Sequence, residues 1–485
     1  FRSRKNIVKI LLKIGKKFVL IILKFYYTFK VLFSLQIYKS ILFITRKNKF
    51  FFKKFSTPQY FLYICSYIYY LHIVYMNKKI ISLKDFEITP NENVIERSQN
   101  FQSYIDQMEL FGCKSYWVMA RTGVGAKMQI EGYDGEVSAY ISNDYLGMSQ
   151  RPETKEAGIN AVLKYGTGAS AAQAIGGYLD IHQQLEQGIA KFVGQEDAIL
   201  FSSGFGANAG LLRAILGKND IAYIDSYIHT SATSGLIGTN VKHIGHNDID
   251  YLDMILEREI GKYQTRLVII DGVYSQNGDL SKLPEYIAVC KKHNCLLMMD
   301  DAHGIGVMGE NGRGTAEYYN CLGQVDIITG TFSKSFGCVG GFVAASTKLI
   351  QYLRYYADSN VFSAAMTPQV AASSLKALEL IQTQPEIRKK LWANVNYLRK
   401  RLTEEGFDIG CSVSAIFPIM VRDNRKVYEI ARELQKRCIF VSGITYPAVR
   451  TKEARLRVSV LASHEIVQLE QLVTALVEIR KSTPF

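Results

Sequence analysis

The chain has 485 residues, of which 48% are hydrophobic and 21% are charged. This length exceeds that of one typical domain, and the composition excludes collagen-like, low-complexity and wholly disordered proteins. The formal net charge is +14, but residues 1–75 contain 15 of the 58 lysines and arginines and no Asp or Glu. The rest of the chain carries 43 basic and 44 acidic side chains. Nucleic-acid binding by a basic body is therefore not supported.

Residues 1–75 differ in composition from the rest, since they contain no Ala and 20 of the 57 aromatic residues, and the first Met is Met76. The favoured hypothesis is an untranslated upstream extension of the reading frame, with translation starting at Met76. A membrane anchor is the next hypothesis, although the uncharged run at residues 60–75 is shorter than the ~20 residues of a spanning helix. A targeting peptide is the third. Membrane association is expected only if residues 1–75 are translated.

The eight cysteines are scattered, and none lies in a C-x-x-C motif or pairs with His at zinc spacing. This pattern predicts no metal site and indicates a reducing, cytoplasmic compartment.

Short apolar runs alternate with amphipathic stretches between residues 142 and 363, which predicts an α/β fold with a mostly parallel sheet. The strand candidates are residues 198–201, 221–224, 267–270, 296–299, 327–329 and 341–344. Helical spacing of apolar residues appears between them, as at residues 181–193. These features predict a large domain at residues 141–365.

After residue 366 the pattern changes to long charged helices at residues 369–381 and 385–405, then short strands near 416–421 and 455–460. This change predicts a smaller α+β domain at residues 366–485. We expect residues 76–140 to pack beside it.

Polar residues follow each apolar run, at the strand ends where ligands bind in open α/β sheets. A glycine turn containing Gly204 and Phe205 leads into a helical pattern, which suits phosphate binding. The other strand ends are followed by Asp225 and His229, by Ser275, by residues 300–303 (DDAH) and by Lys334.

A lysine, a carboxylate, a histidine and a phosphate cradle at neighbouring strand ends are what pyridoxal phosphate requires. Each residue also has an ordinary structural interpretation: His229 as a loop histidine, Asp300 as a cap, Lys334 as a surface lysine. Their joint occurrence at strand ends favours a cofactor site.

The sequence resembles the α-oxoamine synthases, pyridoxal-phosphate enzymes of the aspartate-aminotransferase fold (fold type I). The similar stretches span about 340 residues from Asn143 onward. They are residues 142–147 (SNDYLG), 176–186 (GGYLDIHQQLE), 203–205 (SGF), Asp225 with His229 and Ser231, residues 300–303, and residues 330–342 (GTFSKSFGCVGGF). The last stretch is most similar to the serine palmitoyltransferase branch of the family.

The resemblance implies residue roles. Lys334 would form an imine with the cofactor and later remove the Cα proton, and Asp300 would pair with the pyridine nitrogen. His303 and Ser275 would contact the ring oxygen, and His229 would stack on the ring.

The phosphate would be held by Gly204, Phe205 and Thr331, and by Ser363 from the partner subunit. Asn143 would face the neighbouring active site. The resemblance thus implies a homodimer with shared active sites.

The implied reaction is a decarboxylative Claisen condensation of a small L-amino acid, serine favoured, with an acyl thioester of CoA or acyl carrier protein. Alternatives within the family are 8-amino-7-oxononanoate synthase chemistry, which uses alanine and a pimeloyl thioester, and glycine C-acetyltransferase chemistry. A pyridoxal-phosphate aminotransferase would share Lys334 and Asp300. A membrane-associated interaction protein using residues 1–75 would leave the strand-end residues unexplained.

Two positions depart from the family pattern. Many members have an arginine near Gln173, and some have an arginine before a proline-rich run where this chain has Thr445. Arg457 therefore becomes the candidate ligand for the substrate carboxylate.

Overall fold

This computed structural model describes residues 83–87, 92–112 and 116–485, so the hypotheses about residues 1–75 lie outside the described part. Its largest sheet has seven strands. Their order is β3 (Asp197–Phe201), β9 (Gly341–Ala345), β8 (Ile327–Thr331), β7 (Leu296–Asp300), β6 (Arg266–Asp271), β4 (Ile221–Asp225) and β5 (Asn240–Ile244). Only β9 runs antiparallel to its neighbours in this sheet. This arrangement confirms the predicted α/β fold with a mostly parallel sheet.

Helices cover both faces of this sheet, because alternate residues of each strand point into two separate cores. In β6, Leu267 and Ile269 pack in one core, whereas Val268 and Ile270 pack in the other. The first core includes residues of α7 (Gly204–Ile215), α8 (Thr230–Gly235) and α12 (Thr347–Tyr356). The second includes residues of α6 (Asp180–Val193), α9 (Ile249–Arg258), α10 (Leu283–Lys292) and α14 (Pro368–Thr383). Burial on both faces explains why the strand sequences are almost wholly apolar.

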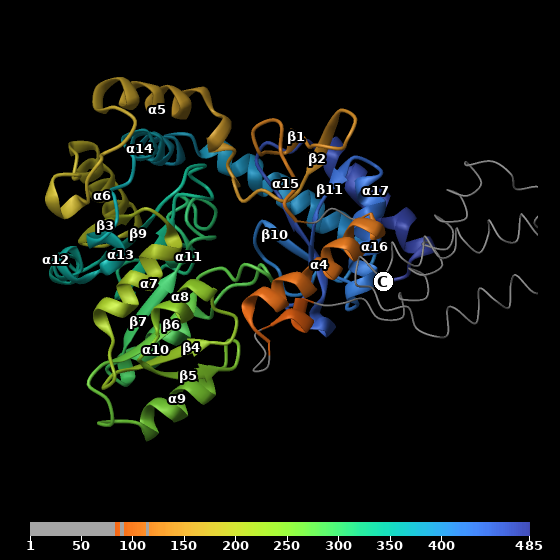
Figure 1. Cartoon of the computed structure of the whole chain (residues 1–485). Helices are drawn as coiled ribbons and strands as arrows, with labels where there is room; N and C mark the ends of the chain where they lie inside the picture. The colour runs from red at the N-terminus through yellow and green to blue at the C-terminus, as the bar shows by residue number, and fades with distance from the viewer. Residues whose placement is uncertain (1–82, 88–91, 113–115) are drawn as a thin grey trace, which may run out of the picture. The chain divides into compact units, whose positions relative to one another are not determined.

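The C-terminal part contains a second sheet, drawn in blue in Figure 1, with the antiparallel order β10 (Ile416–Met420), β13 (Arg455–Ser459) and β12 (Ser442–Ile444). Its helices are α15 (Pro385–Glu404), α16 (Asn424–Gln435) and α17 (Ile466–Ser482). The helices α5 (Pro152–Tyr165), α11 (Thr315–Tyr318) and α13 (Asp358–Val361) complete the described α-helices of residues 141–485.

The segment before residue 140 contains α4 (Val94–Phe111), β1 (Lys127–Gln129) and β2 (Glu136–Ala139). Strand β2 pairs with β1 and with β11 (Ile439–Phe440) of the C-terminal part. Helix α4 begins at a capping box in which the Asn93 side chain accepts from the backbone N–H of Glu96. Arg432 of α16 donates to the backbone carbonyl of Phe111. The domain boundaries at residues 140 and 365 remain predictions.

No described helix is both long and apolar enough to cross a membrane. Among the same residues, no three His, Cys, Asp or Glu side chains gather as the ligands of a metal ion would.

Candidate active site

The strands β6, β7, β8 and β3 end at one edge of the large sheet, and β9 begins there. Asp271 at the end of β6 is paired with Asp300 at the end of β7, and Asp300 is paired with Thr329 of β8. Thr331 and Phe201, which end β8 and β3, both pair with Gly341 of β9. The loops that follow these strands therefore converge, as expected for a ligand site in an open α/β sheet.

Asp300 is buried and held in a fixed orientation by two donors. Its Oδ2 accepts from Nδ2 of Asn208 at 2.6 Å, and its Oδ1 accepts from the backbone N–H of Ala302 at 3.0 Å. Hydrogen bonds to a charged acceptor are short and strong. Sequence reasoning missed Asn208, which lies in the first turns of α7; its only sequence signal is its place four residues after Gly204 in the glycine turn.

A directed chain of hydrogen bonds connects Asn208 to His229. Nδ2 of Asn208 donates to Oγ of Ser231 at 2.8 Å, so the Ser231 hydroxyl is free to donate to Nδ1 of His229 at 2.7 Å. Ser231 is buried, whereas His229 is exposed at the start of α8. The imidazole is thus fixed from behind while the ring remains accessible.

Lys334 follows β8 and has no hydrogen-bond or ion-pair partner among the described residues. Burial lowers the pKa of Lys334 to about 8, although the nearby carboxylates of Asp300 and Asp271 oppose this shift. A lysine with this pKa is partly neutral near pH 7 to 8, and the neutral amine is the form that acts as a nucleophile or a base.

The carboxylate of Asp301, the neighbour of Asp300, is enclosed by Thr315 and by two glycines. Its carboxylate accepts from the backbone N–H and the hydroxyl of Thr315 at 2.7 and 2.6 Å. A Cβ atom added to Gly272 or Gly304 would come within 2.2 Å of the Asp301 carboxylate. Burial raises the pKa of Asp301 to about 7. The site-facing carboxylate is therefore that of Asp300.

Asp271 is paired with Asp300 on the neighbouring strand β6 and is also buried. Its Oδ1 has no hydrogen-bond partner among the described residues. Burial, followed by the charge of Asp300, raises the pKa of Asp271 well above its usual range. Asp271 therefore keeps its proton to a higher pH than an exposed aspartate does.

The first turn of α7 presents free backbone donors. Ser203 caps the helix, with its Oγ accepting from the N–H of Gly206 at 2.9 Å. The N–H groups of Gly204 and Phe205 have no partner among the described residues. A Cβ atom at Gly204 would stand 3.0 Å from Cβ of Thr331. A helix N-terminus with free N–H groups and no side chain over it suits a phosphate.

Two hydroxyl groups lie at the same place. Oγ1 of Thr331 donates to the carbonyl of Gly340 at 2.8 Å and contacts Oγ of Ser333 at 2.8 Å. The proton of Thr331 is therefore used within the protein, and the exposed Ser333 is an additional candidate phosphate ligand that sequence reasoning did not select. Ser363 follows α13, and its hydroxyl donates to the carbonyl of Ala364 at 3.3 Å.

Arg457 is a buried cation without an acidic partner among the described residues. Its guanidinium donates to the carbonyl of Ser275 at 2.7 Å, to Oδ1 of Asn143 at 3.2 Å and to Oγ of Ser459 at 2.9 Å. An anionic ligand would compensate the buried positive charge of Arg457. The structure thus brings together Arg457, Asn143 and Ser275, three of the residues predicted for the site.

His303 is buried and near these groups. Its Nδ1 lies 2.7 Å from the hydroxyl of Tyr145. Burial, together with the charges of Lys334 and Arg457, lowers the pKa of His303 well below its usual range. Tyr145 belongs to the SNDYLG stretch but was not assigned a role from the sequence.

The two positions that depart from the family pattern have local partners. Thr445 is buried, and its hydroxyl pairs with the hydroxyl of Tyr428 at 2.9 Å. Nε2 of Gln173 donates to the carbonyl of Leu200 at 3.2 Å.

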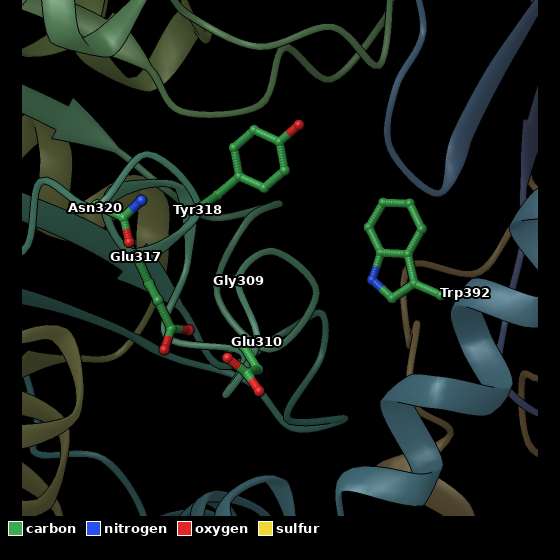
Figure 2. A pocket seen from close by; sticks show the side chains of 6 residues that line it. All are labelled: Gly309, Glu310, Glu317, Tyr318, Asn320 and Trp392. Atoms are coloured by element: carbon green, nitrogen blue, oxygen red, sulfur yellow. The ribbon is translucent and has the colours of Figure 1, made fainter.

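A separate cavity of about 450 Å³ contains none of the predicted site residues (Figure 2). Tyr318 faces Trp392 of α15 across it, and Glu310 and Glu317 lie on one side. The Glu317 carboxylate already accepts from Asn311 and from the backbone N–H of Arg313. This cavity adds no group to the strand-end site.

Comparisons with known proteins agree with this arrangement. The model of the family "Aminotransferase class I and II" matches residues 141–476. Serine palmitoyltransferase of Sphingobacterium spiritivorum is 38% identical over 388 residues, which cover 80% of this chain and 96% of that protein. The 8-amino-7-oxononanoate synthase of Thermoanaerobacter pseudethanolicus is 37% identical over 348 residues, covering 71% and 88%.

Solved structures give the same result. Serine palmitoyltransferase of Sphingomonas wittichii superposes with a TM-score of 0.77 at 28% identity, covering 81% of this chain and 99% of that chain. A structure of SPT with a PLP internal aldimine has a TM-score of 0.76 with the same identity and coverage. The chain therefore belongs to the aminotransferase class I and II family and, within it, to the α-oxoamine synthases.

Proposed function

We propose that this chain is a pyridoxal-phosphate-dependent C-acyltransferase that joins a small L-amino acid, serine favoured, to an acyl thioester. The products are an α-amino ketone, CO2 and the free thiol of CoA or acyl carrier protein. The observation that carries the proposal is one edge of the large sheet that holds an unpaired lysine and an oriented carboxylate, together with a buried arginine of β13 that donates to the carbonyl of Ser275 and has no acidic partner among the described residues.

The residues at this edge fit pyridoxal 5′-phosphate, the cofactor of the family. Gly204, Phe205 and Ser333 would hold its phosphate, and Thr331 would join them by turning its hydroxyl proton from the Gly340 carbonyl to the phosphate. Asp300 would hold the proton of the ring nitrogen. Asn208 Oδ1 and Asp271 Oδ1 are buried without partners among the described residues, as polar atoms beside a ligand site can be. The bound cofactor supplies an electron sink for the charge that develops at Cα of the amino acid.

The chain's own residues then perform the remaining work. Arg457, with Asn143, would bind the carboxylate of the amino acid, since bidentate pairing suits a guanidinium and a carboxylate. The Lys334 amine would bond the cofactor and later remove the proton from Cα. The pKa of about 8 supports this second role, because a base works best near the operating pH. His229 would cover the reacting group and exclude water.

The serine preference follows from the relatives rather than from a contact in the site. The first relatives compared above include both serine palmitoyltransferases and 8-amino-7-oxononanoate synthases. Alanine with a pimeloyl thioester is therefore the second candidate pair. An aminotransferase reaction would release no thiol, which separates it from both.

We propose that the active enzyme is a homodimer. Exposed apolar side chains lie near the phosphate end of the site, with Phe205 49% exposed, Phe362 88% and Ile175 81%. Burying them against a second copy would be favourable, and it would bring Ser363 to a neighbouring site, whereas Asn143 contacts Arg457 of its own chain. The cysteines of the described residues are free thiols, which supports a cytoplasmic location.

The test is a product mass. Purified protein is incubated with pyridoxal phosphate, one of serine, alanine or glycine, and palmitoyl-, pimeloyl- or acetyl-CoA. The expected result is an α-amino ketone from serine and palmitoyl-CoA, with one thiol released per product. A keto acid formed without thiol release would instead establish an aminotransferase, and ketone formed only from alanine and pimeloyl-CoA would establish the second candidate.

A further inference from the structure

The shortest contact of the Tyr145 hydroxyl is with a ring nitrogen of His303, and the Arg457 guanidinium also hydrogen-bonds to this hydroxyl. Tyr145 is 1% exposed and His303 7% exposed. The hydroxyl lies 2.7 Å from Nδ1 of His303 and 3.4 Å from Oδ1 of Asn143. The first distance is typical of a hydrogen bond from a hydroxyl, whereas the second lies beyond the usual range for two oxygen atoms.

His303 is neutral in this environment. Burial is the main cause of its low pKa, and the positive charges of Lys334 and Arg457 act in the same direction. A neutral imidazole carries one proton, so one ring nitrogen donates and the other accepts. The Tyr145 hydroxyl accepts a hydrogen bond from His303 in one tautomer and donates one to it in the other.

If Nδ1 carried the proton, it would donate to the Tyr145 oxygen, and the phenol proton would have to go to Asn143. That acceptor is 3.4 Å away and already accepts from Arg457 at 3.2 Å. Burial raises the pKa of Tyr145 to about 12, so the phenol keeps its proton and needs an acceptor. A buried hydroxyl without a good acceptor for its proton lowers the stability of the folded protein.

If Nε2 carries the proton, all three groups are satisfied. Tyr145 donates to Nδ1 of His303, and Asn143 remains the acceptor for Arg457. Nε2–H then has no acceptor among the described residues, so it is available to a ligand.

We propose that Tyr145 is a positioning residue that fixes His303 in the Nε2–H tautomer, so that His303 presents a hydrogen-bond donor to the ring oxygen of the bound cofactor. This inference rests on the proposed function for the identity of the ligand, but the tautomer itself is a property of the chain alone. A donor at this position stabilises the ring oxygen as an anion. The aromatic residue of the SNDYLG stretch thus acts on the cofactor through His303.

The test uses protein without cofactor, labelled with 15N in histidine. Long-range 1H–15N NMR distinguishes protonated from unprotonated ring nitrogens, and the His303 signals are assigned by their loss in His303→Gln. The expected wild-type result near pH 7 is a protonated Nε2 and an unprotonated, hydrogen-bonded Nδ1. A protonated Nδ1 or an imidazolium would overturn the proposal, whether or not any variant folds.

Tyr145→Phe removes only the hydroxyl. We expect the Nδ1 signal to move to the position of a nitrogen without a donor, and the affinity for pyridoxal phosphate to fall by roughly a factor of ten, the value of about one hydrogen bond. Tyr223→Phe is the matched control, because Tyr223 is fully buried and its hydroxyl donates to Glu259 at 2.8 Å. Unchanged His303 signals in Tyr145→Phe would contradict the proposal. A failed product-mass test would leave the NMR result standing, so the two failures are distinguishable.

Discussion

Replacement of Asn208 by Ala tests the orientation of Asp300. The change removes the 2.6 Å donor to Oδ2 of Asp300 and also the donor to Ser231, which supports His229. A hydrogen bond to a charged group contributes about 1.5–3 kcal/mol. If that energy serves to hold the carboxylate against the ring nitrogen, the rate of Cα-proton removal falls roughly 10- to 150-fold.

The assay follows exchange of the Cα proton of serine with solvent deuterium by NMR, in the absence of an acyl donor, so that only proton removal is measured. Asn394→Ala is the matched control. Asn394 is a buried amide of α15 that donates to the carbonyls of Leu461 and His464 at 3.0 and 2.8 Å. The Asn394→Ala variant should be less stable than wild type but keep the wild-type rate of Cα-proton exchange per folded molecule. An exchange rate within about twofold of wild type in Asn208→Ala would refute the role given to this hydrogen bond.

Five further variants probe the carboxylates, a buried ion cluster and the dimer. Asp300→Asn should still bind pyridoxal phosphate but slow Cα-proton exchange by orders of magnitude. Asp301→Asn should lower the melting temperature, because one of the carboxylate oxygens that accept from Thr315 is lost. The opposite pattern would mean that the two residues have each other's role. The two ring nitrogens of His246 lie 3.0 Å from a carboxylate oxygen of Asp225 and 2.7 Å from one of Asp279. Burial alone would lower the pKa of His246, but the two carboxylates raise it to about 9, above the usual 6.5. Its contribution to stability is therefore complete below about pH 6.5 and is lost as the pH rises through 9, so the melting temperature should fall over this window in wild type and stay flatter in His246→Gln. Lys334→Ala and Asn143→Ala are each expected to be inactive. Because Asn143 contacts Arg457 of its own chain, mixed dimers of the two variants should recover no activity, whereas recovery of up to about a quarter of the activity of the same amount of wild-type protein would show that Asn143 serves the neighbouring site.

The strands of the large sheet could be predicted because they are buried on both faces and therefore read as apolar runs. Strand β5 was not predicted, since it lies at the edge of the sheet and most of Asn240–Ile244 is exposed or partly exposed. The short strands β1, β2, β11 and β12 also carry too few apolar residues to be recognised. Their formation depends on partners that are distant in sequence, such as β11 for β2.

The strand-end rule was sufficient to select Lys334, Asp300 and His303, because parallel strands end at a common edge. It could not select Asn208, which lies inside a helix and meets Asp300 only through the packing of α7 on the sheet. Nor could it assign Tyr145, whose role depends on a hydrogen bond to a residue 158 positions away. The distinction between Asp300 and Asp301 likewise required the niche formed around Asp301 by Thr315 and nearby glycines.

The central claim is that Lys334 carries the cofactor at this sheet edge. The most direct measurement is reduction of the pyridoxal-phosphate-loaded protein with borohydride, followed by digestion and mass spectrometry. We predict one pyridoxyl-phosphate label per chain, located on Lys334, and no such label in Lys334→Ala. A label on another lysine, or a visible chromophore that survives in Lys334→Ala and is reduced by borohydride, would contradict the account.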